Sequence, residues 1–285
     1  MRLSSVLYSD SLTKPPCVSI RRESAGLNDS TNASNPSQSQ SQAQDVELTE
    51  QLINDLSQFD TPTVCNALEV VQPKRRGYGY TTKPLVCTRP ELGVMVGVAR
   101  TATIRAAHPS DLSGRAARAL SDAYYAYIEG LGDQGTPQGA RPSIVVIQDL
   151  DQERGYGSWW GEVNSNIHLG LGCRGVITDG SVRDLPDIPA QFQMLADRVG
   201  PSHAYVHVVD FSRPVTVAGM RVQHGDIIHA DQHGAVVVPS AVAEQVKEAA
   251  LKIARSEQVI IRAAQEPGFS AAKLRAAQGA AAEIH

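Results

Sequence analysis

The sequence predicts an α/β fold in which mixed β-sheets are flanked by helices. The run Ile144–Ile147 is apolar and β-branched, which is typical of a buried strand. Segments with helical spacing alternate with such strands as far as residue 196. Beyond residue 200 the pattern is mostly β, and a long helix follows from Ala241. Such alternation is typical of sheets covered by helices.

Each element follows from its own pattern. A helix is expected over 46–56, and Thr61-Pro62-Thr63 begins a second one through Leu68, since Pro is favoured in the first turn of a helix. The remaining elements of the first part are a strand at 92–105, a helix at 111–128, strands at 142–148 and 175–178, a helix at 162–171, a turn at 179–181 and a short helical region around 184–196. The second part contains strands at 204–209, 214–217, 226–229 and 235–238, a helix from Ala241 to about Ala264 capped by Ser240, and a final Ala-rich helix.

Composition narrows the class of protein. The chain has 285 residues, 42% hydrophobic and 20% charged, with a net charge of −4, so it shows no basic surface for nucleic acid. It contains no apolar run of the roughly 18–20 residues that span a membrane. The four cysteines are scattered, which favours free thiols and a cytoplasmic protein. Residues 1–45, rich in Ser, Gln and Asn, predict a disordered tail, and 46–285 a single domain.

Polar groups that suit a small oxo acid are spaced around one strand. Arg183 and Asp184 lie just beyond the strand 175–178, where open α/β sheets build their sites. Glu162 follows Trp160-Gly161 at the start of a helix, where unpaired backbone N–H groups attract anions. Together they offer backbone N–H groups that bind an anion, a fixed cation at Arg183 and a hard oxygen ligand at Asp184.

Each of these residues also has a purely structural interpretation. Asp184 could cap the helical segment 185–188. Arg183 could pair with a surface carboxylate, and Glu162 could favour the positive end of its helix by about 0.3–1 kcal/mol. His229 is expected to be a structural histidine more often than a site residue.

The spacing resembles a known family. Gly161-Glu162, followed after twenty residues by Arg183-Asp184, is similar to the Asp/Glu-x20-Arg-Asp signature of the RraA-like family. That family includes class II 4-hydroxy-4-methyl-2-oxoglutarate / 4-carboxy-4-hydroxy-2-oxoadipate aldolases. Segments 60–68 and 224–234 also resemble family segments, although Asn66 and His233 stand where acidic residues are usual. The resemblance covers roughly residues 50–265.

The resemblance implies a swivelling β/β/α-type domain in homotrimers or hexamers with sites at subunit interfaces. It implies Mg²⁺ or Mn²⁺ held mostly by water, with Asp184 as the protein ligand. A 2-oxo acid would place its carboxylate on backbone N–H groups and its keto oxygen toward the metal and Arg183, and cleavage would release pyruvate. The implied catalytic residues are Arg183, Glu162 and, across an interface, Glu257. The implied substrate-binding residues are Gly161, Val163, Asn164, Ser165 and Arg183.

Three functions remain open at this point. The first is a metal-dependent aldolase or oxaloacetate decarboxylase; no lysine lies in a predicted buried strand, so a Schiff-base aldolase is not expected. The second is a regulator that binds an RNA-degrading endonuclease and inhibits it. The third is a family member that acts on an unrelated substrate and keeps the enolate-stabilising core. The distal half of the substrate has no sequence signal, because loops would supply its contacts.

Overall fold

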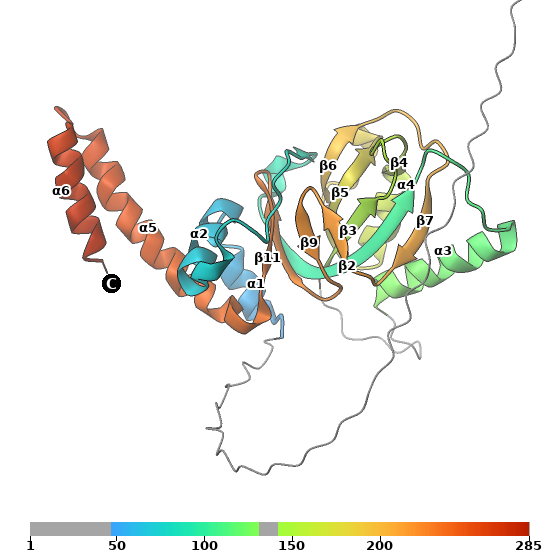
Figure 1. Cartoon of the computed structure of the whole chain (residues 1–285), viewed down its shortest axis with the longest axis horizontal. Coiled ribbons are helices and arrows are strands. Elements are labelled where there is room, and N and C mark those ends of the chain that lie inside the picture. Colours follow the sequence, from blue (N-terminus) through green and yellow to red (C-terminus); the bar gives the residue numbers. More distant parts are fainter. Residues whose placement is uncertain (1–46, 131–141, 285) are drawn as a thin grey trace, which may run out of the picture. The chain divides into compact units, whose positions relative to one another are not determined.

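The computed structural model describes residues 47–130 and 142–284 (Figure 1). The expected disordered tail, residues 1–45, lies outside these residues. The helices are α1 (Glu50–Leu56), α2 (Thr61–Val71), α3 (Gly114–Glu129), α4 (Glu162–Gly170), α5 (Ala243–Gln265) and α6 (Ala271–Ala282), with short 3₁₀ turns η1 (Pro73–Arg75), η2 (Pro90–Leu92), η3 (Leu185–Asp187) and η4 (Ser240–Val242). The strands are β1 (Val86–Cys87), β2 (Met95–Arg105), β3 (Ser143–Asp149), β4 (Ser158–Trp160), β5 (Cys173–Val182), β6 (Gln193–Val199), β7 (His207–Phe211), β8 (Val215–Val217), β9 (Met220–Val222), β10 (Ile227–Asp231) and β11 (Gly234–Val238).

A curled mixed sheet forms the centre of the domain. Its strand order is β1-β6-β5-β3-β2-β10-β11, with β4 paired to β5 and β7 paired to β2. The neighbours β2, β3, β5 and β6 run parallel, and β4 is parallel to β5, whereas β1, β7, β10 and β11 join antiparallel. Strands β8 and β9 form a separate antiparallel pair. The predicted α/β fold with mixed sheets and flanking helices is confirmed.

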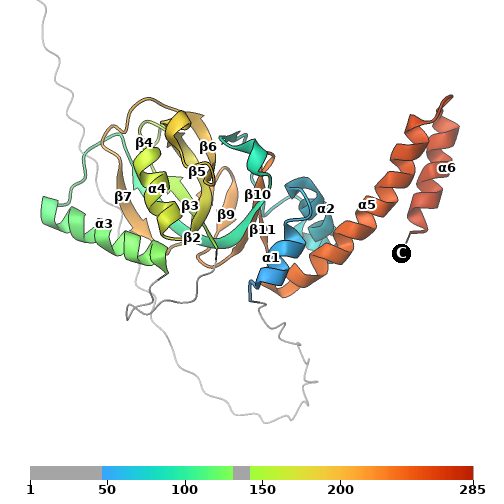
Figure 2. The ribbon, with the colours of Figure 1, turned by 180° about the vertical axis from the view of Figure 1, so that it is seen from behind.

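Alternating side chains place β3 in two different cores. Val145 and Ile147 pack with Tyr124 of α3 and with Trp160, whereas Ile144 and Val146 face the apolar side chains of β8 and β9. A third core joins α1, α2 and the first half of α5 to β10 and β11. Figure 2 shows α3 and α4 beside the parallel strands, apart from α1, α2 and α5. Since both faces of β3 are buried, its near-continuous apolar run is explained.

Two sequence predictions near residue 180 were wrong. The expected turn 179–181 is an irregularity inside β5, where the pairing register with β6 shifts between Thr178 and Ser181. The Gly180 N–H donates to Thr178 Oγ1 there, which satisfies the bulged backbone locally. The expected helical region 184–196 contains only η3 and then strand β6, because prolines interrupt the helix and parallel pairing with β5 buries the apolar run that follows.

Most other elements were predicted correctly, within a few residues. The short strands β1, β4 and β9 were missed, because two or three residues carry no measurable periodicity. No helix in residues 47–130 or 142–284 is long and apolar enough to span a membrane.

Candidate functional site

All the site residues expected from the sequence except Glu257 lie where β4 and β5 end together. Strand β4 pairs with Ser181 and Val182 of β5, and the Arg183 N–H donates to the Trp160 carbonyl at 2.9 Å. This pairing sets Gly161 and the start of α4 directly beside Arg183 and Asp184. We call residues 160–165 and 183–185 the β4–β5 corner.

Asp184 does not cap the turn that follows it. Its backbone is left-handed, with φ 55° and ψ 38°, and its side chain makes no cap hydrogen bond to η3. Its carboxylate instead turns to α4, where Oδ2 accepts a 3.3 Å hydrogen bond from the Glu162 N–H. Asp184 therefore occupies the N-cap position of η3 without a side-chain capping bond, and its carboxylate belongs to the corner.

Arg183 keeps a buried donor without an acceptor. Its Nε lies 3.6 Å from Asp184 Oδ2, and in the described part of the chain this buried atom has no hydrogen-bond partner. An unsatisfied buried donor costs about 1–3 kcal/mol. About a third of the side chain as a whole is exposed, so a small ligand would reach the side chain at atoms other than the buried Nε.

Gly161 packs closely against Arg183 and Asp184. A Cβ at this position would collide with Asp184 Oδ2 and lie 3.1 Å from Arg183 Cγ. The backbone of Gly161 is extended, with φ −163°, so any residue could adopt its conformation. The missing side chain therefore allows the acid and the cation to approach the helix start.

The first turn of α4 offers two free N–H groups. The Ser165 N–H donates to the Gly161 carbonyl at 3.0 Å and is the first to close the helix, and Asp184 accepts from the Glu162 N–H. The N–H groups of Val163 and Asn164 remain at the helix start without an intrahelical acceptor. Val163 is 67% exposed, and Asn164 is partly exposed.

Ser165 and Asn164 use their side chains inside the fold. The buried Ser165 hydroxyl donates to the Gly161 carbonyl at 2.7 Å. The Asn164 amide donates to the Trp159 carbonyl at 2.7 Å and accepts from the Tyr125 hydroxyl at 2.9 Å. The Asn164 side chain and the Ser165 N–H are both engaged in hydrogen bonds within the fold. Of these two residues, only the Asn164 N–H is left to bind a ligand.

An open depression of about 570 Å³ lies against the corner. It is lined by Arg183, Asp184, Leu185, Pro186, Val199, Gly200 and Pro201. The only charged residues in this lining are Arg183 and Asp184. A ligand in the depression would therefore meet its polar contacts at one end.

The donor set fits a cation that keeps most of its water. Asp184 is the only carboxylate lining the depression, and the described residues contain no group of three or more His, Cys, Asp or Glu that could hold a metal. A structural zinc site needs four protein ligands, whereas Mg²⁺ commonly binds through one or two carboxylates. A cation bound by Asp184 alone would have one protein ligand and keep several waters, as is common for Mg²⁺.

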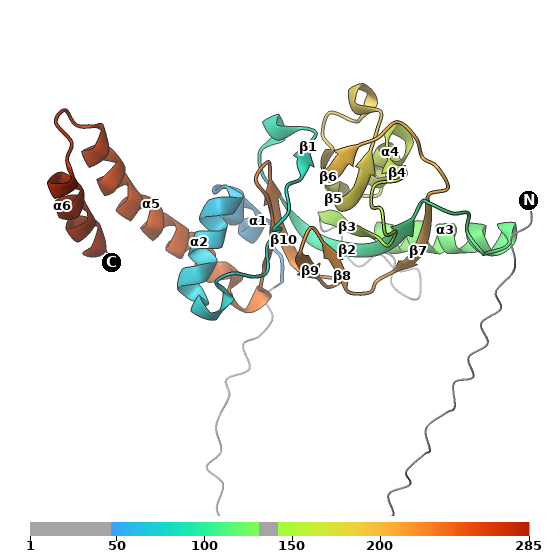
Figure 3. The same ribbon diagram turned by 45° about the horizontal axis from the view of Figure 1, so that its top comes forward.

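Glu257 lies apart from the corner within one chain. It is exposed in the second half of α5, and the buried residues of α5 all lie between Ala243 and Ala250. The second half of α5 packs against α6 and points away from the sheet (Figure 3). The structure thus brings together Glu162, Arg183 and Asp184, and leaves Glu257 outside.

Other polar groups were missed or have a structural role. Asp149, Arg154 and Asp179 connect the loop before β4 to β5, and the acidic run directly after strand 142–148 was the signal for them. His229 is buried between Thr61 Oγ1, at 3.0 Å, and the carbonyls of Leu56 and Phe59, and burial lowers its pKa. It is a structural histidine.

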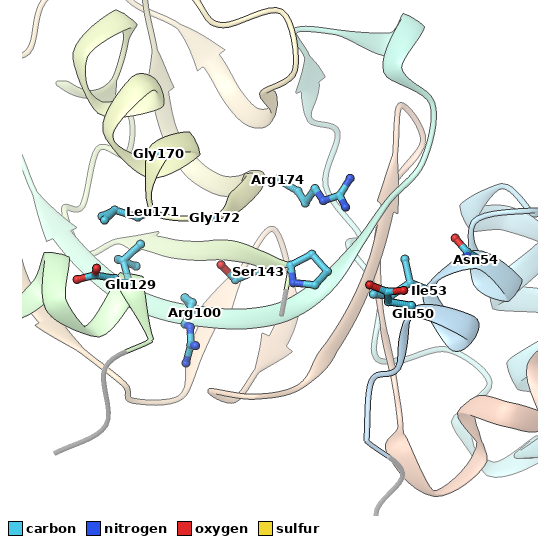
Figure 4. Close-up of a pocket in the computed structure, with 12 residues that line it drawn as sticks. Glu50, Ile53, Asn54, Arg100, Glu129, Ser143, Gly170, Leu171, Gly172 and Arg174 are labelled. Atoms are coloured by element: carbon cyan, nitrogen blue, oxygen red, sulfur yellow. The ribbon is translucent and has the colours of Figure 1, made fainter. Parts of the chain in front are cut away.

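A larger cavity, of about 610 Å³, lies elsewhere (Figure 4). Its lining includes Glu50 of α1, Ser143 at the start of β3 and Arg174 of β5. Arg174 is at the opposite end of β5 from Arg183, and no residue of the β4–β5 corner lines this cavity.

The curled mixed sheet and the polar corner at the end of β5 define an α/β domain of the swivelling β/β/α type. The chain belongs to the RraA-like family (Aldolase/RraA), whose profile matches residues 61–237. This family includes both aldolases and RNase inhibitors.

Related proteins extend this comparison. An uncharacterized protein of Methanocaldococcus jannaschii is 29% identical over 123 residues, which span 42% of this chain and 59% of that protein. The crystal structure of an uncharacterized protein from Pseudomonas syringae pv. tomato is similar with a TM-score of 0.60 and 21% identity, over 83% of this chain and 96% of that one. The crystal structure of RraAS2 of Streptomyces coelicolor, an unusual member of the RNase ES inhibitor RraA family, is similar with a TM-score of 0.55 and 19% sequence identity. This match covers 74% of this chain and 96% of that one. Both structural matches concern the fold.

Proposed function

We propose that this protein is a divalent-metal-dependent lyase that cleaves a small 2-oxo acid to release pyruvate. The substrate would be of the 4-hydroxy-4-methyl-2-oxoglutarate type, oxaloacetate, or both. One observation carries the proposal: the Arg183 side chain, about a third exposed, lies beside the Asp184 carboxylate, which in turn accepts from the first N–H of α4.

The helix start supplies the contacts for the substrate carboxylate. The free N–H groups of Val163 and Asn164 and the positive end of the helix dipole favour an anion at this position. The Ser165 N–H is engaged within the helix, so we assign two donors rather than three. Gly161 contributes by leaving room between this anion site and Arg183.

Arg183 contributes at the bond-breaking step. When the C3–C4 bond of a 2-oxo acid breaks, negative charge develops on the keto oxygen, and a fixed guanidinium stabilises it. Loss of CO₂ from oxaloacetate develops the same charge, so one corner could serve both reactions. About a third of the Arg183 side chain is exposed, so the guanidinium would meet the developing charge at atoms other than the buried Nε.

Asp184 would hold Mg²⁺ or Mn²⁺. When bound, the cation supplies Lewis-acid stabilisation of the same developing charge. The Glu162 N–H and Arg183 Nε both lie near one carboxylate oxygen, Asp184 Oδ2, at 3.3 and 3.6 Å.

Glu162 and Glu257 would move the proton of the substrate's 4-hydroxyl group. Glu162 is exposed at the first position of α4, beside the free N–H groups. Glu257 would have to come from a neighbouring subunit, since α5 carries it away from its own corner. This assignment requires a homotrimer or hexamer with shared sites.

The competing candidate is a regulator that binds an RNA-degrading endonuclease without chemistry of its own. Its support is the likeness in fold to RraAS2, a member of an RNase inhibitor family. Such a role would use the surface of the protein and would give Arg183 and Asp184 no part in bond cleavage.

Pyruvate release distinguishes the two candidates. Purified protein is incubated with oxaloacetate and with 4-hydroxy-4-methyl-2-oxoglutarate, each with Mg²⁺ and with EDTA, and pyruvate is measured against the uncatalysed rate. The lyase predicts pyruvate with Mg²⁺ that EDTA abolishes. A folded, Mg²⁺-supplied sample that releases no pyruvate from either acid would contradict it.

A further inference from the structure

The depression beside the β4–β5 corner has a charged end and an apolar end. Arg183 and Asp184 form the charged end. The apolar end, as we call the rest of the lining, consists of Leu185, Pro186, Val199, Gly200 and Pro201. None of these five side chains carries a charge or a hydrogen-bonding group. A ligand whose polar head is bound at the corner would therefore lay the rest of its length against apolar side chains.

The apolar end is built where β5 and β6 finish side by side. Val199 pairs with Val182 in the parallel ladder, and the Gly200 N–H donates to the Val182 carbonyl at 2.9 Å. Leu185 is partly buried and packs against one of the hydrophobic cores. The rings of the two prolines in the lining fix their φ angles. This wall is therefore formed before any ligand binds.

Val199 is the side chain of this wall with the most apolar surface to offer. It is 49% exposed at the end of a strand, whereas Leu185 is already partly buried. An alkyl group of a ligand that covered Val199 would remove apolar surface of both partners from water, which favours binding.

The nearest further cation along β6 lies outside the depression. Arg198 Nε pairs with Asp197 Oδ2 at 2.6 Å. A Cβ on Gly155 would lie 3.0 Å from Arg198 Cδ, so this side chain runs along the loop that precedes β4. Arg198 is not part of the lining. Among the described residues, the lining thus offers Arg183 as its cation and none for a second carboxylate.

We propose that the apolar end takes an alkyl group on the distal half of the 2-oxo acid, and that Val199 sets this preference. A carboxylate at the same place would keep its water, meet no cation and gain no contact. In 4-hydroxy-4-methyl-2-oxoglutarate, C4 carries both groups, and the methyl would face Val199 while the carboxylate would face solvent. The inference rests on the proposed function, because the corner has to bind the head of the 2-oxo acid.

The size of the effect follows from apolar surface. Complete burial of one methylene strengthens binding by about fourfold. Because the depression is open, each added methylene is covered only in part. We therefore expect a gain of about two- to fourfold in affinity per methylene, up to the length that reaches the last residue of the wall.

Binding of unreactive acids tests this preference without any turnover. Acids that lack the 4-hydroxyl group cannot undergo retro-aldol cleavage, so their affinities are measured by calorimetry on the full-length protein with Mg²⁺. Affinity should increase from 2-oxobutanoate to 2-oxopentanoate to 2-oxohexanoate. 2-Oxopentanoate and 2-oxoglutarate differ only in a terminal methyl or carboxylate, and 2-oxoglutarate should bind at least about threefold more weakly.

Variants of Val199 assign the preference to this residue. Val199→Lys adds a cation at the apolar end, so 2-oxoglutarate should bind about two- to fivefold more tightly than to the wild type, and 2-oxopentanoate more weakly. Val199→Thr keeps the β-branched shape and should flatten the dependence on chain length. Val209→Lys, at an exposed valine of β7 outside the lining, changes the net charge equally and should leave both affinities unchanged. Circular dichroism checks that each variant folds.

Wild-type affinities that do not depend on chain length would overturn the inference, as would tighter binding of 2-oxoglutarate than of 2-oxopentanoate. Failure of the lyase proposal alone looks different. In that case the wild type would release no pyruvate, while the alkyl preference and its reversal in Val199→Lys would still be measured. A protein that binds none of these acids would contradict both proposals.

Discussion

Arg183 and Asp184 carry opposite charges on adjacent residues and still do not share a hydrogen bond, since Nε and Oδ2 are 3.6 Å apart. Asp184 has a left-handed backbone, which costs an L-residue roughly 1–2 kcal/mol. That conformation turns the carboxylate toward α4 instead of toward the turn that follows. The Asp184 carboxylate therefore lies in the β4–β5 corner, and the proposed metal role would give this strained conformation a purpose.

Asp184→Asn tests the metal role of this carboxylate. Asn tolerates the left-handed region nearly as well as Asp, so the melting temperature should change little. The loss of charge should abolish the dependence of pyruvate release on Mg²⁺ concentration. Asp187→Asn, an exposed neighbour in η3, is the control and should keep the wild-type titration. An unaltered Mg²⁺ titration in Asp184→Asn would place the ligand elsewhere.

Gly161→Ala should damage the corner by contact alone. The new Cβ would collide with Asp184 Oδ2 and crowd Arg183. We expect a loss of about 1–3 kcal/mol in the free energy of unfolding, as for overpacked sites, and at least a tenfold fall in turnover. Gly170→Ala, at the other end of α4 where a Cβ meets no atom within 4 Å, should retain full activity. Equal behaviour of the two variants would argue against the close approach.

At the scale of elements, α4 is fixed by aromatic and histidine contacts on its inner face. His168 Nε2 lies 2.9 Å from the Tyr124 hydroxyl, and its Nδ1 lies 2.6 Å from the Asn164 carbonyl. Its ring packs 4.5 Å from Trp160. The helix start at the corner is thus held from behind by α3 and β4.

His168 should make stability pH-dependent. Burial lowers its pKa from 6.5 to about 4, so the unfolded chain takes up the proton at a higher pH than the folded one. Its contribution is fully present above about pH 6.5 and is lost as the pH falls through 4. Between pH 7 and 5 the wild type should lose about 2 kcal/mol more than His168→Gln, measured by denaturant unfolding.

Asp179 also changes the stability with pH, but it does so equally in the wild type and in His168→Gln, so the difference between them excludes its effect. Its raised pKa acts in the opposite direction, with stability lost as the pH rises through about 6. Identical pH slopes in the wild type and His168→Gln would contradict a buried, neutral His168.

Elements with a clear helical or strand periodicity were predicted correctly from the sequence. The predictions were wrong where contacts between distant segments determine the secondary structure. Helix α4 was expected at 162–171 and ends at Gly170, because its apolar spacing and glycine-flanked ends are local signals. Strand β6 was read as helical, since a short apolar run fits either period and only pairing with β5 settles it. Asp179-Gly180-Ser181 has turn composition, yet neighbouring strands hold it in β5 as a bulge.

The site was predictable to the extent that it is local in sequence or carried by a motif. Arg183, Asp184 and the start of α4 were expected together and lie together. The engagement of Ser165 within the helix and the Arg154–Asp179 pair depend on how β4 meets β5, which no spacing reveals. The catalytic roles themselves remain predictions.

At the scale of the whole molecule, α5 separates Glu257 from the corner of its own chain. Its second half packs on α6 and leaves the sheet (Figure 3). If Glu257 contributes to catalysis, it must serve a neighbouring subunit, and each site would then combine two chains.

Mixing inactive variants tests this sharing of sites. Arg183→Ala and Glu257→Ala should each be nearly inactive as homo-oligomers. Unfolding and refolding them together should restore part of the pyruvate release, because some interfaces would pair an intact Arg183 with an intact Glu257. Mixtures as inactive as the separate variants, in oligomers confirmed by light scattering, would remove Glu257 from the site.

The most direct test of the central claim is the effect of Arg183→Ala on Mg²⁺-dependent pyruvate release, with Arg213→Ala as an exposed-arginine control. Because Arg183 would stabilise charge that develops only as the bond breaks, its loss should lower kcat by about 10²–10³. The folded state should be unaffected, and Arg213→Ala should match the wild type. Wild-type turnover in Arg183→Ala would contradict the assignment of the β4–β5 corner as the active site.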